Sequence, residues 1–209
     1  MKILIADDHP LIREGFKKIL SREVGLTVVG EASNAGEVLS FLRNHPCDLV
    51  VLDINMPGRS GLEVLEDIRR QNPEVKILIL SIHPESRFAI RALKAGAAGY
   101  LTKDSAPEEL VAAIRKIQEG RKYISPNLAE HIAYSIGPEQ AMNPHDRLSN
   151  REMEVFLKIA AGKTIQEIAQ ELNLSASTIN TYRNRILEKM GLKSNAEIIH
   201  YALRNHLLD

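Results

Sequence analysis

The sequence predicts an α/β domain followed by an all-α domain, and two observations carry this prediction. Up to about residue 121, apolar runs alternate five times with amphipathic stretches. That alternation is typical of a parallel sheet covered by helices on both faces. From residue 147 onward, only helical periodicity remains. We therefore expect a doubly wound (βα)5 domain with strand order 2-1-3-4-5, followed by a four-helix domain.

The strands of the first domain are predicted from runs of aliphatic residues. The runs at 48–53 and 75–81 are almost continuously apolar, as expected for central strands that are buried on both faces. Proline and glycine lie between the runs and mark the turns. The expected strands are 2–7, 26–31, 48–53, 75–81 and 98–102, and the expected helices are 10–22, 34–44, 60–71, 85–95 and 107–120.

The second half is divided by its turn residues and helix starts. Three prolines and a glycine interrupt residues 122–146, which we interpret as a linker with one short helix near 128–136. Capping boxes, in which Ser or Thr precedes Glu by three positions, predict helix starts at Ser149, Thr164 and Ser194. Another helix should begin near Ser175. The predicted boundaries are a first domain at 1–121, a linker at 122–146 and a second domain at 147–209.

Composition narrows the class of protein. The 209 residues are 44% hydrophobic and 26% charged, as in globular proteins, and 27 basic residues balance 27 acidic ones. Because the net charge is zero, any nucleic-acid binding must come from the arrangement of side chains. One cysteine excludes an internal disulfide. No apolar run approaches the ~20 residues of a membrane helix, and no signal-peptide pattern is present, so we expect a cytoplasmic protein without membrane contact.

Polar side chains follow the predicted strands at their carboxyl ends. Asp7 and Asp8 follow the first strand and Asp53 ends the third, and these strands are neighbours in the order 2-1-3-4-5. Clustered carboxylates repel one another unless a cation joins them, and oxygen ligands suit Mg²⁺, which calls for a phosphoryl partner. Ser81 and Lys103 end the next two strands, where they could contact phosphoryl oxygens.

Each of these residues also has an ordinary explanation. Asp7 and Asp8 could cap the next helix, Asp53 could belong to a turn, Lys103 could be a solvated charge and Ser81 a strand-end hydroxyl. These explanations must hold independently of one another. We favour a single phosphoryl site because it accounts for all five positions together.

The motifs around these residues resemble those of response-regulator receiver domains. They are Ile5-Ala6-Asp7-Asp8-His9-Pro10, Leu52-Asp53-Ile54-Asn55-Met56-Pro57-Gly58, Leu80-Ser81 and Gly99-Tyr100-Leu101-Thr102-Lys103-Asp104. The resemblance implies a flavodoxin-like fold in which Asp53 is the phosphoacceptor. It further implies that Asp7, Asp8, Asp53 and the Asn55 carbonyl hold Mg²⁺, that Ser81 and Lys103 contact the phosphoryl group, and that Tyr100 changes rotamer as Ser81 moves.

Some positions depart from the usual receiver pattern. Asp104 stands where many receivers have proline, so we do not expect a cis peptide bond after Lys103. Bulky Ile82 follows Ser81 and should narrow access for water and small phosphodonors. Asn55 and His83 flank the site and should help to set the lifetime of an acyl phosphate.

Residues 164–190 read as helix, short turn and helix, which is the helix-turn-helix unit. The second helix presents Asn180, Thr181, Asn184 and Arg185. Amide side chains can read base edges, and arginine can bind phosphates. An amphipathic helix turns polar residues outward in any case, so the pattern by itself also fits a solvated face.

Residues 147–209 resemble the LuxR-type output domain. The resemblance rests on Leu148-Ser149-x-Arg151-Glu152-x-Glu154-Val155, on Ala160-x-Gly162-Lys163-Thr164-x-x-Glu167-Ile168-Ala169 and on Thr178-Ile179-Asn180-Thr181 through Lys189-Met190-Gly191. The whole chain thus resembles a two-component response regulator of the NarL/FixJ class. This implies base contacts from Asn180, Thr181 and Asn184, backbone contacts from Thr178, Tyr182, Arg185 and Lys189, and a dimer contact on the last helix.

The expected function is transcription regulation. A sensor histidine kinase would phosphorylate Asp53, and a homodimer would then bind promoter double-stranded DNA; the chain would be no enzyme beyond its own phosphorylation and dephosphorylation. One alternative is an aspartyl-phosphate phosphatase or phosphotransferase. Such hydrolases typically have a second acidic residue two positions after the nucleophile, where this chain has Asn55. Another is an adaptor that needs no phosphorylation, against which the full acidic set argues. A nucleotide-binding fold is disfavoured because no glycine-rich loop follows the first strand.

Overall fold

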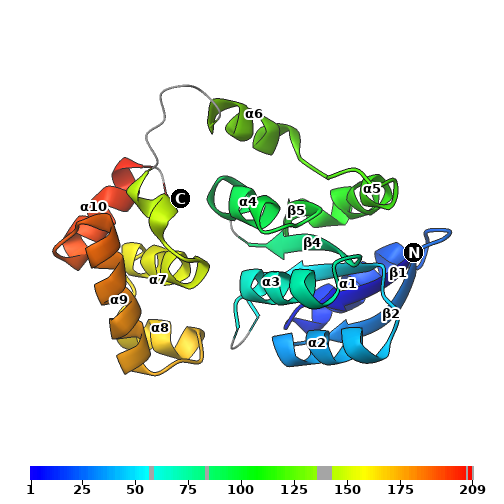
Figure 1. Ribbon diagram of the computed structural model, residues 1–209, viewed down its shortest axis with the longest axis horizontal. Coiled ribbons are helices and arrows are strands. Elements are labelled where there is room, and N and C mark those ends of the chain that lie inside the picture. Colours follow the sequence, from blue (N-terminus) through cyan, green and yellow to red (C-terminus); the bar gives the residue numbers. More distant parts are fainter. Residues whose placement is uncertain (57–58, 83–84, 136–142, 206, 209) are drawn as a thin grey trace. The chain divides into compact units, whose positions relative to one another are not determined.

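The fold is described from a computed structural model, which covers all residues except 57–58, 83–84, 136–142, 206 and 209 (Figure 1). The chain forms two compact units, Met1–Ile136 and Gly137–Asp209. The first is an α/β domain and the second is helical, as the sequence predicts. Each unit is described by itself. Among the described helices, none is both long and apolar enough to cross a membrane.

The first unit is built on a five-stranded parallel sheet with the order β2-β1-β3-β4-β5, which confirms the predicted topology. The strands lie close to their predicted ranges. They are β1 (Lys2–Ala6), β2 (Thr27–Ala32), β3 (Leu49–Asp53), β4 (Lys76–Ser81) and β5 (Gly99–Thr102). Ala6 of β1 pairs with Leu52 of β3, so the residues that follow them emerge side by side at one edge of the sheet.

Helices cover both faces of the sheet. Successive strand residues point to opposite sides, so each face packs its own set of side chains against the helices. One set of strand residues, including Ile3, Val51 and Leu78, packs with α1 (Pro10–Leu20) and α5 (Ala106–Gln118). The other face carries α2 (Ala35–Asn44), α3 (Gly61–Gln71) and α4 (Glu85–Lys94), of which α4 packs on β5 (Figure 1).

The start of α1 excludes one ordinary explanation of the acidic pair. The N-cap of α1 is His9, whose side chain makes no capping bond within the described chain, and Pro10 follows it. Neither Asp7 nor Asp8 therefore caps the helix. Instead, Asp7 Oδ1 accepts the amide of His9 at 2.8 Å.

The linker helix α6 (Pro126–Ser135) begins two residues before the expected range and packs against α4 (Figure 1). Leu128 of α6 is fully buried. Just before α6, Tyr123 forms an isolated bridge with Gly99 of β5, and its hydroxyl donates to Glu109 of α5 at 2.6 Å. The first part of the linker is thus attached to β5, α5 and α4.

The second unit contains η1 (Pro144–Arg147), α7 (Asn150–Ala160), α8 (Ile165–Glu171), α9 (Ala176–Met190) and α10 (Asn195–Arg204). The capping boxes at Ser149 and Thr164 form as predicted. The third capping box, predicted at Ser194, forms only in part. The Ser194 side chain accepts the Glu197 amide, but the Glu197 carboxylate accepts the amide of Lys193 rather than that of Ser194. The start of α9 is capped by Ser175.

Candidate functional site

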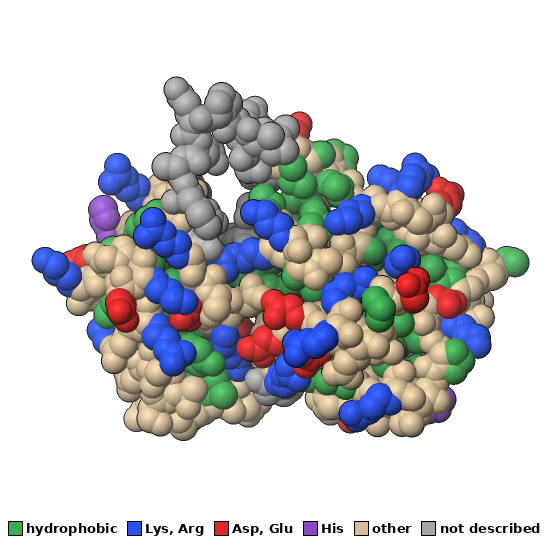
Figure 2. Space-filling view, viewed as in Figure 1, with side chains coloured by type: hydrophobic (Ala, Val, Ile, Leu, Met, Phe, Trp, Pro, Cys, Tyr) green, Lys and Arg blue, Asp and Glu red, His purple; other side chains and the backbone are tan. Residues whose placement is uncertain are grey.

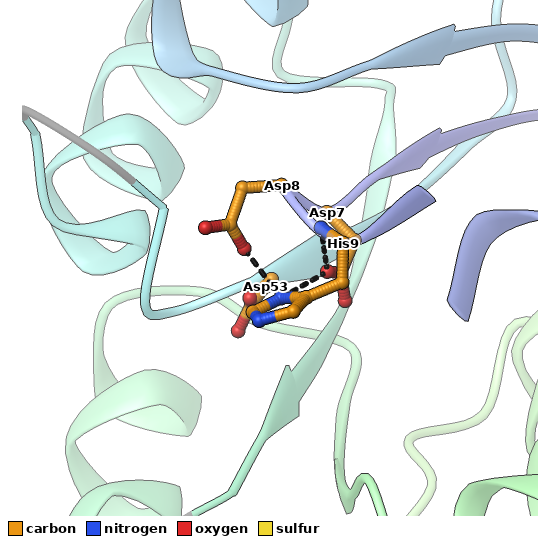
Figure 3. Close-up of side chains that lie close together, drawn as sticks. All are labelled: Asp7, Asp8, His9 and Asp53. Atoms are coloured by element: carbon orange, nitrogen blue, oxygen red, sulfur yellow. Dashed lines mark hydrogen bonds and ion pairs between the residues drawn. The ribbon is translucent and has the colours of Figure 1, made fainter. Parts of the chain in front are cut away.

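Three predicted acidic residues come together at the carboxyl edge of the sheet (Figure 3). Asp7 follows β1 and Asp53 ends β3, and both are fully buried. Asp8 is adjacent, with 28% of its side chain exposed. One ligand atom from each of these residues and one from His9 lie within 4.8 Å of one another. The strand order therefore brings the acidic residues together, as predicted from their positions at the strand ends.

Lys103 completes this cluster from the end of β5. Its Nζ lies 2.7 Å from Asp53 Oδ2, to which it donates a hydrogen bond, and 2.7 Å from Asp7 Oδ2. Only 8% of the Lys103 side chain is exposed. The backbone holds it in place because the Lys103 amide donates to the Ser81 carbonyl at 2.8 Å. The bond after Lys103 is trans, as are all peptide bonds between described residues.

Burial and charge act in opposite directions on the two buried partners. Burial raises the pKa of Asp53 above its ordinary value, although Lys103 and the Asn55 amide act to lower it. For Lys103, burial acts to lower the pKa, but Asp53 and Asp7 outweigh it and raise the pKa above its ordinary value. The lysine is therefore held as a cation between two carboxylates.

Of the remaining receiver-type residues, Asn55 contacts Asp53 directly. The amide of Asn55 donates to Asp53 Oδ1 at 3.0 Å. Ser81 ends β4 and Tyr100 lies in β5, and both are fully buried. Ile82, which we expect to narrow access to the site, is 65% exposed. His83, with the Pro57-Gly58 part of the turn, lies outside the described residues.

The donor set fits a hard dication. It offers several carboxylate oxygens against one lysine, so the cluster carries excess negative charge. Asp7 Oδ2 and Asp8 Oδ1 are buried, and each has a single nitrogen at 2.7 Å, that of Lys103 for Asp7 and that of His9 for Asp8. Such oxygens are the ligands that Mg²⁺ prefers. The site is thus compatible with Mg²⁺.

Sequence reasoning missed two residues that shape this site. Arg13 Nη1 donates to the Asp7 carbonyl at 2.7 Å, and its Nε donates to Glu31 at 3.0 Å, so α1 and β2 hold the acidic loop. Gly61 begins α3, where an added Cβ would lie 2.3 Å from the Asp53 carbonyl oxygen. Arg at one helical turn from an acidic pair, and Gly after a strand, are too common to stand out in a sequence.

The second candidate site is the exposed face of α9. Helices α8 and α9 pack together, with Ile168, Ile179 and Ile186 among their buried residues. Asn173, in the left-handed conformation (φ 51°), lies in the turn between them. Of the predicted DNA-contact residues, the exposed ones are Asn180, Thr181, Asn184, Arg185 and Lys189, and the half-buried ones are Thr178 and Tyr182.

Two basic residues of α9 have partners within the helical unit. Lys189 Nζ lies 2.6 Å from Oε2 of Glu152, a buried residue of α7. The Nε of Arg183 donates to Asn195 Oδ1 at 2.6 Å. Figure 2 shows Lys and Arg side chains scattered among acidic ones rather than forming one continuous basic surface on the visible face. Two of the cations of α9 are thus engaged within the helical unit.

Comparison with known families divides the chain in the same way as the motifs. Residues 3–115 match the response regulator receiver domain, and residues 146–202 match the bacterial regulatory proteins of the luxR family.

Full-length relatives are similar over nearly the whole chain. Response regulator UvrY of Escherichia coli K12 is 40% identical over 208 residues, covering 99% of this chain and 95% of the relative. Response regulator GacA of Pseudomonas aeruginosa is 40% identical over 210 residues, covering 100% and 98%.

Solved structures show the same architecture. RcsB from Salmonella enterica serovar Typhimurium, bound to promoter rprA in the presence of the phosphomimetic BeF₃⁻, has a TM-score of 0.69 at 27% identity, over 96% of this chain and 97% of that one. A LuxR-family two-component response regulator from Aurantimonas has a TM-score of 0.61 at 43% identity, over 64% and 96%.

Proposed function

The chain belongs to the two-component response regulators that carry a LuxR-type DNA-binding domain, and we propose that phosphorylation of Asp53 controls its binding to promoter DNA. The observation that carries this proposal is the position of Asp53, buried at the end of β3 and paired with Lys103 beside Asp7. The functional division we propose is a receiver at 1–121, a linker at 122–146 and a DNA-binding domain at 147–209.

The chemical step is transfer of a phosphoryl group from a phosphohistidine of a sensor histidine kinase to Asp53. A carboxylate oxygen of Asp53 forms the new P–O bond while the P–N bond breaks, and the imidazole leaves with the electron pair. Lys103 neutralises charge on the transferred group, and Ser81 donates a hydrogen bond to it. Positioning and charge neutralisation are the main requirements of phosphoryl transfer.

Magnesium would be held by Asp53, by the Asn55 carbonyl and, directly or through water, by Asp7 and Asp8. When bound, Mg²⁺ supplies a positive charge that offsets the negative charge on the phosphoryl oxygens. The clustered oxygens of Asp7, Asp8 and Asp53 and the excess of carboxylates over cations support this assignment.

The signal would leave the site through β4 and β5. The phosphoryl group draws Ser81 toward itself, and Tyr100 in β5 stabilises the new arrangement from inside the domain, where its ring is fully buried here. Tyr123 is bridged to Gly99, next to Tyr100, and α6 packs on α4. A change in α4 and β5 would therefore reach the linker directly, as a shift between two populations.

The helical unit would read DNA through α9, acting as a homodimer. Asn180, Thr181 and Asn184 would face bases, and backbone contacts would come from Thr178, Tyr182, Arg185 and Lys189. Part of α10 would form the dimer contact, placing two α9 helices about one turn of DNA apart, ~34–36 Å. RcsB, which is similar in structure, has been solved as two dimers bound to two DNAs. Promoter binding would place the protein in the cytoplasm.

The acceptor is tested by replacing Asp53 with Asn, which keeps the size of the side chain and removes the nucleophile. Incubation with a radiolabelled phosphodonor should label the wild type and not Asp53→Asn, and phosphorylation should strengthen promoter binding only in the wild type. Asp48→Asn, an acidic residue at the opposite end of β3, is the matched control and should be labelled normally. Label retained by Asp53→Asn would overturn the assignment.

The DNA contacts are tested by comparing a specific promoter with random DNA. Asn180→Ala with Asn184→Ala should lower the preference for the promoter, by about 1–3 kcal/mol for each base that is no longer read. Arg185→Ala should weaken binding to both DNAs and reduce the salt dependence by about one phosphate contact. Equal effects of both variants on the two DNAs would contradict the assigned roles.

A further inference from the structure

His9 stands in the acidic cluster, although the predicted metal ligands do not include it. Its Nδ1 lies 2.7 Å from Asp8 Oδ1 and 3.2 Å from Asp7 Oδ1. Figure 3 shows the imidazole reaching from the start of α1 over Asp53. The nitrogen therefore lies close to the carboxylate oxygens of both residues.

The backbone fixes the position of His9, while its ring stays free to adjust. The His9 amide donates to Asp7 Oδ1 at 2.8 Å, and Pro10 restricts the chain at the first residue of α1. The His9 side chain is 63% exposed, so the imidazole can rotate without disturbing the core. The fold thus places the His9 imidazole beside the acidic residues, and its exposure lets the ring adjust its orientation to bind a cation.

Resting on the proposed metal site of the receiver, we propose that His9 Nδ1 is an additional ligand of the bound cation and raises the affinity for first-row transition dications. Opposite ligands in a six-coordinate shell with bonds of about 2.1 Å lie about 4.2 Å apart. The four ligand atoms lie within 4.8 Å of one another, so small side-chain movements bring them to a common ion. The contact between Nδ1 and Asp8 Oδ1 is the one such an ion would replace.

The nature of the ligand determines which metals respond to His9. Mg²⁺ prefers oxygen ligands and keeps several of its waters, so it gains little from an imidazole. Imidazole suits Ni²⁺, Zn²⁺ and other transition dications, whose affinities rise from Mn²⁺ through Co²⁺ to Ni²⁺. A site with His9 should therefore bind Co²⁺ and Ni²⁺ more tightly than an all-oxygen site, with little change for Mg²⁺.

The test is metal titration of the full-length protein by calorimetry, with wild type, His9→Ala and a matched control, His45→Ala. His45 follows α2 and stacks on Phe41 rather than facing the cluster. We expect His9→Ala to lose at least about tenfold in Co²⁺ and Ni²⁺ affinity, the scale seen for loss of metal-site partners, and less than about threefold for Mg²⁺. His45→Ala should match the wild type with every metal.

Spectroscopy supplies an independent readout. Pulsed electron paramagnetic resonance of bound Mn²⁺ should detect a directly coordinated nitrogen in the wild type and in His45→Ala, but not in His9→Ala. Unchanged Co²⁺ affinity in His9→Ala, an increase for all metals, or no coordinated nitrogen in the wild type would overturn the role of His9. Asp8→Asn separates the two proposals, because unchanged Mg²⁺ affinity in that variant would overturn the metal site itself.

Discussion

The ion pair between Lys189 and Glu152 allows a quantitative test of how the helical unit is held together. Lys189 is 40% exposed, whereas Glu152 is 3% exposed and also accepts the Ser149 amide in the capping box. Lys189→Met keeps the apolar stem and leaves a buried carboxylate without its cation. Breaking a fully buried ion pair costs about 3–5 kcal/mol, and breaking an exposed pair costs less than about 1 kcal/mol. Because only the carboxylate of this pair is buried, we expect Lys189→Met to lower the free energy of unfolding by about 1–2 kcal/mol.

Lys163 provides a matched control. It is 39% exposed, close to the exposure of Lys189, but its partner Glu171 is 38% exposed and also pairs with Lys158. Lys163→Met should therefore cost less than about 0.5 kcal/mol, as is usual for exposed pairs. The two variants differ mainly in the burial of the carboxylate they leave behind.

The pH dependence gives the same prediction a second signature. Burial acts to raise the pKa of Glu152, but Lys189 and Ser149 outweigh it and lower the pKa below its ordinary value of 4.5. A carboxylate of lowered pKa stabilises the native state above its unfolded pKa, and this contribution is lost as the pH falls through the native pKa. The wild type should therefore lose more stability than Lys189→Met between about pH 5 and pH 3.

Amide hydrogen exchange in α7 and α9 of the full-length protein measures these free energies within the helical unit. Its opening free energy should fall in Lys189→Met, and Glu152→Gln should remove most of the additional effect of Lys189→Met when the two are combined. Equal losses in Lys189→Met and Lys163→Met would refute the argument from burial. So would a pH dependence in Lys189→Met that matches that of the wild type.

Two further predictions concern the receiver. Lys103→Met leaves buried carboxylates without their cation, so thermal unfolding in a chelator should show a loss of about 3 kcal/mol or more, with partial recovery in Mg²⁺; insensitivity to Mg²⁺ would count against the site. Gly61→Ala places a Cβ 2.3 Å from the carbonyl oxygen of the proposed acceptor, so urea unfolding should show a cost of about 1–3 kcal/mol, together with slower labelling. Its control is Gly15→Ala, where an added Cβ meets no described atom within 4 Å and stability should not fall; equal costs would contradict the steric argument.

Strand ends and sheet order account for how far the site could be predicted. Asp7 and Asp53 end apolar runs, and right-handed βαβ connections restrict the order in which such strands can pair. Their meeting therefore follows from patterns within a few residues and from a general rule of chain geometry. The same holds for the helix starts at Ser149 and Thr164, where the capping bonds span only three residues.

Contacts between distant side chains could not be predicted in this way. Even a local contact can differ from its prediction. At Ser194 the capping box forms only in part, because the Glu197 carboxylate accepts the amide of Lys193 instead of that of Ser194. Lys189 is predicted to contact the DNA backbone, and only the folded chain shows that it also pairs with Glu152, 37 positions earlier. His9 has no predicted role in the metal site, and only the folded chain places its imidazole among the carboxylates.

By itself, the sequence determined the two-unit architecture, the parallel sheet and the meeting of the acidic residues, because hydrophobic periodicity and strand-end position are properties of short segments. Only the tertiary structure decided which cation faces which carboxylate and where the imidazole of His9 points. Those choices depend on side-chain rotamers and burial, which are set when elements far apart in the chain pack together.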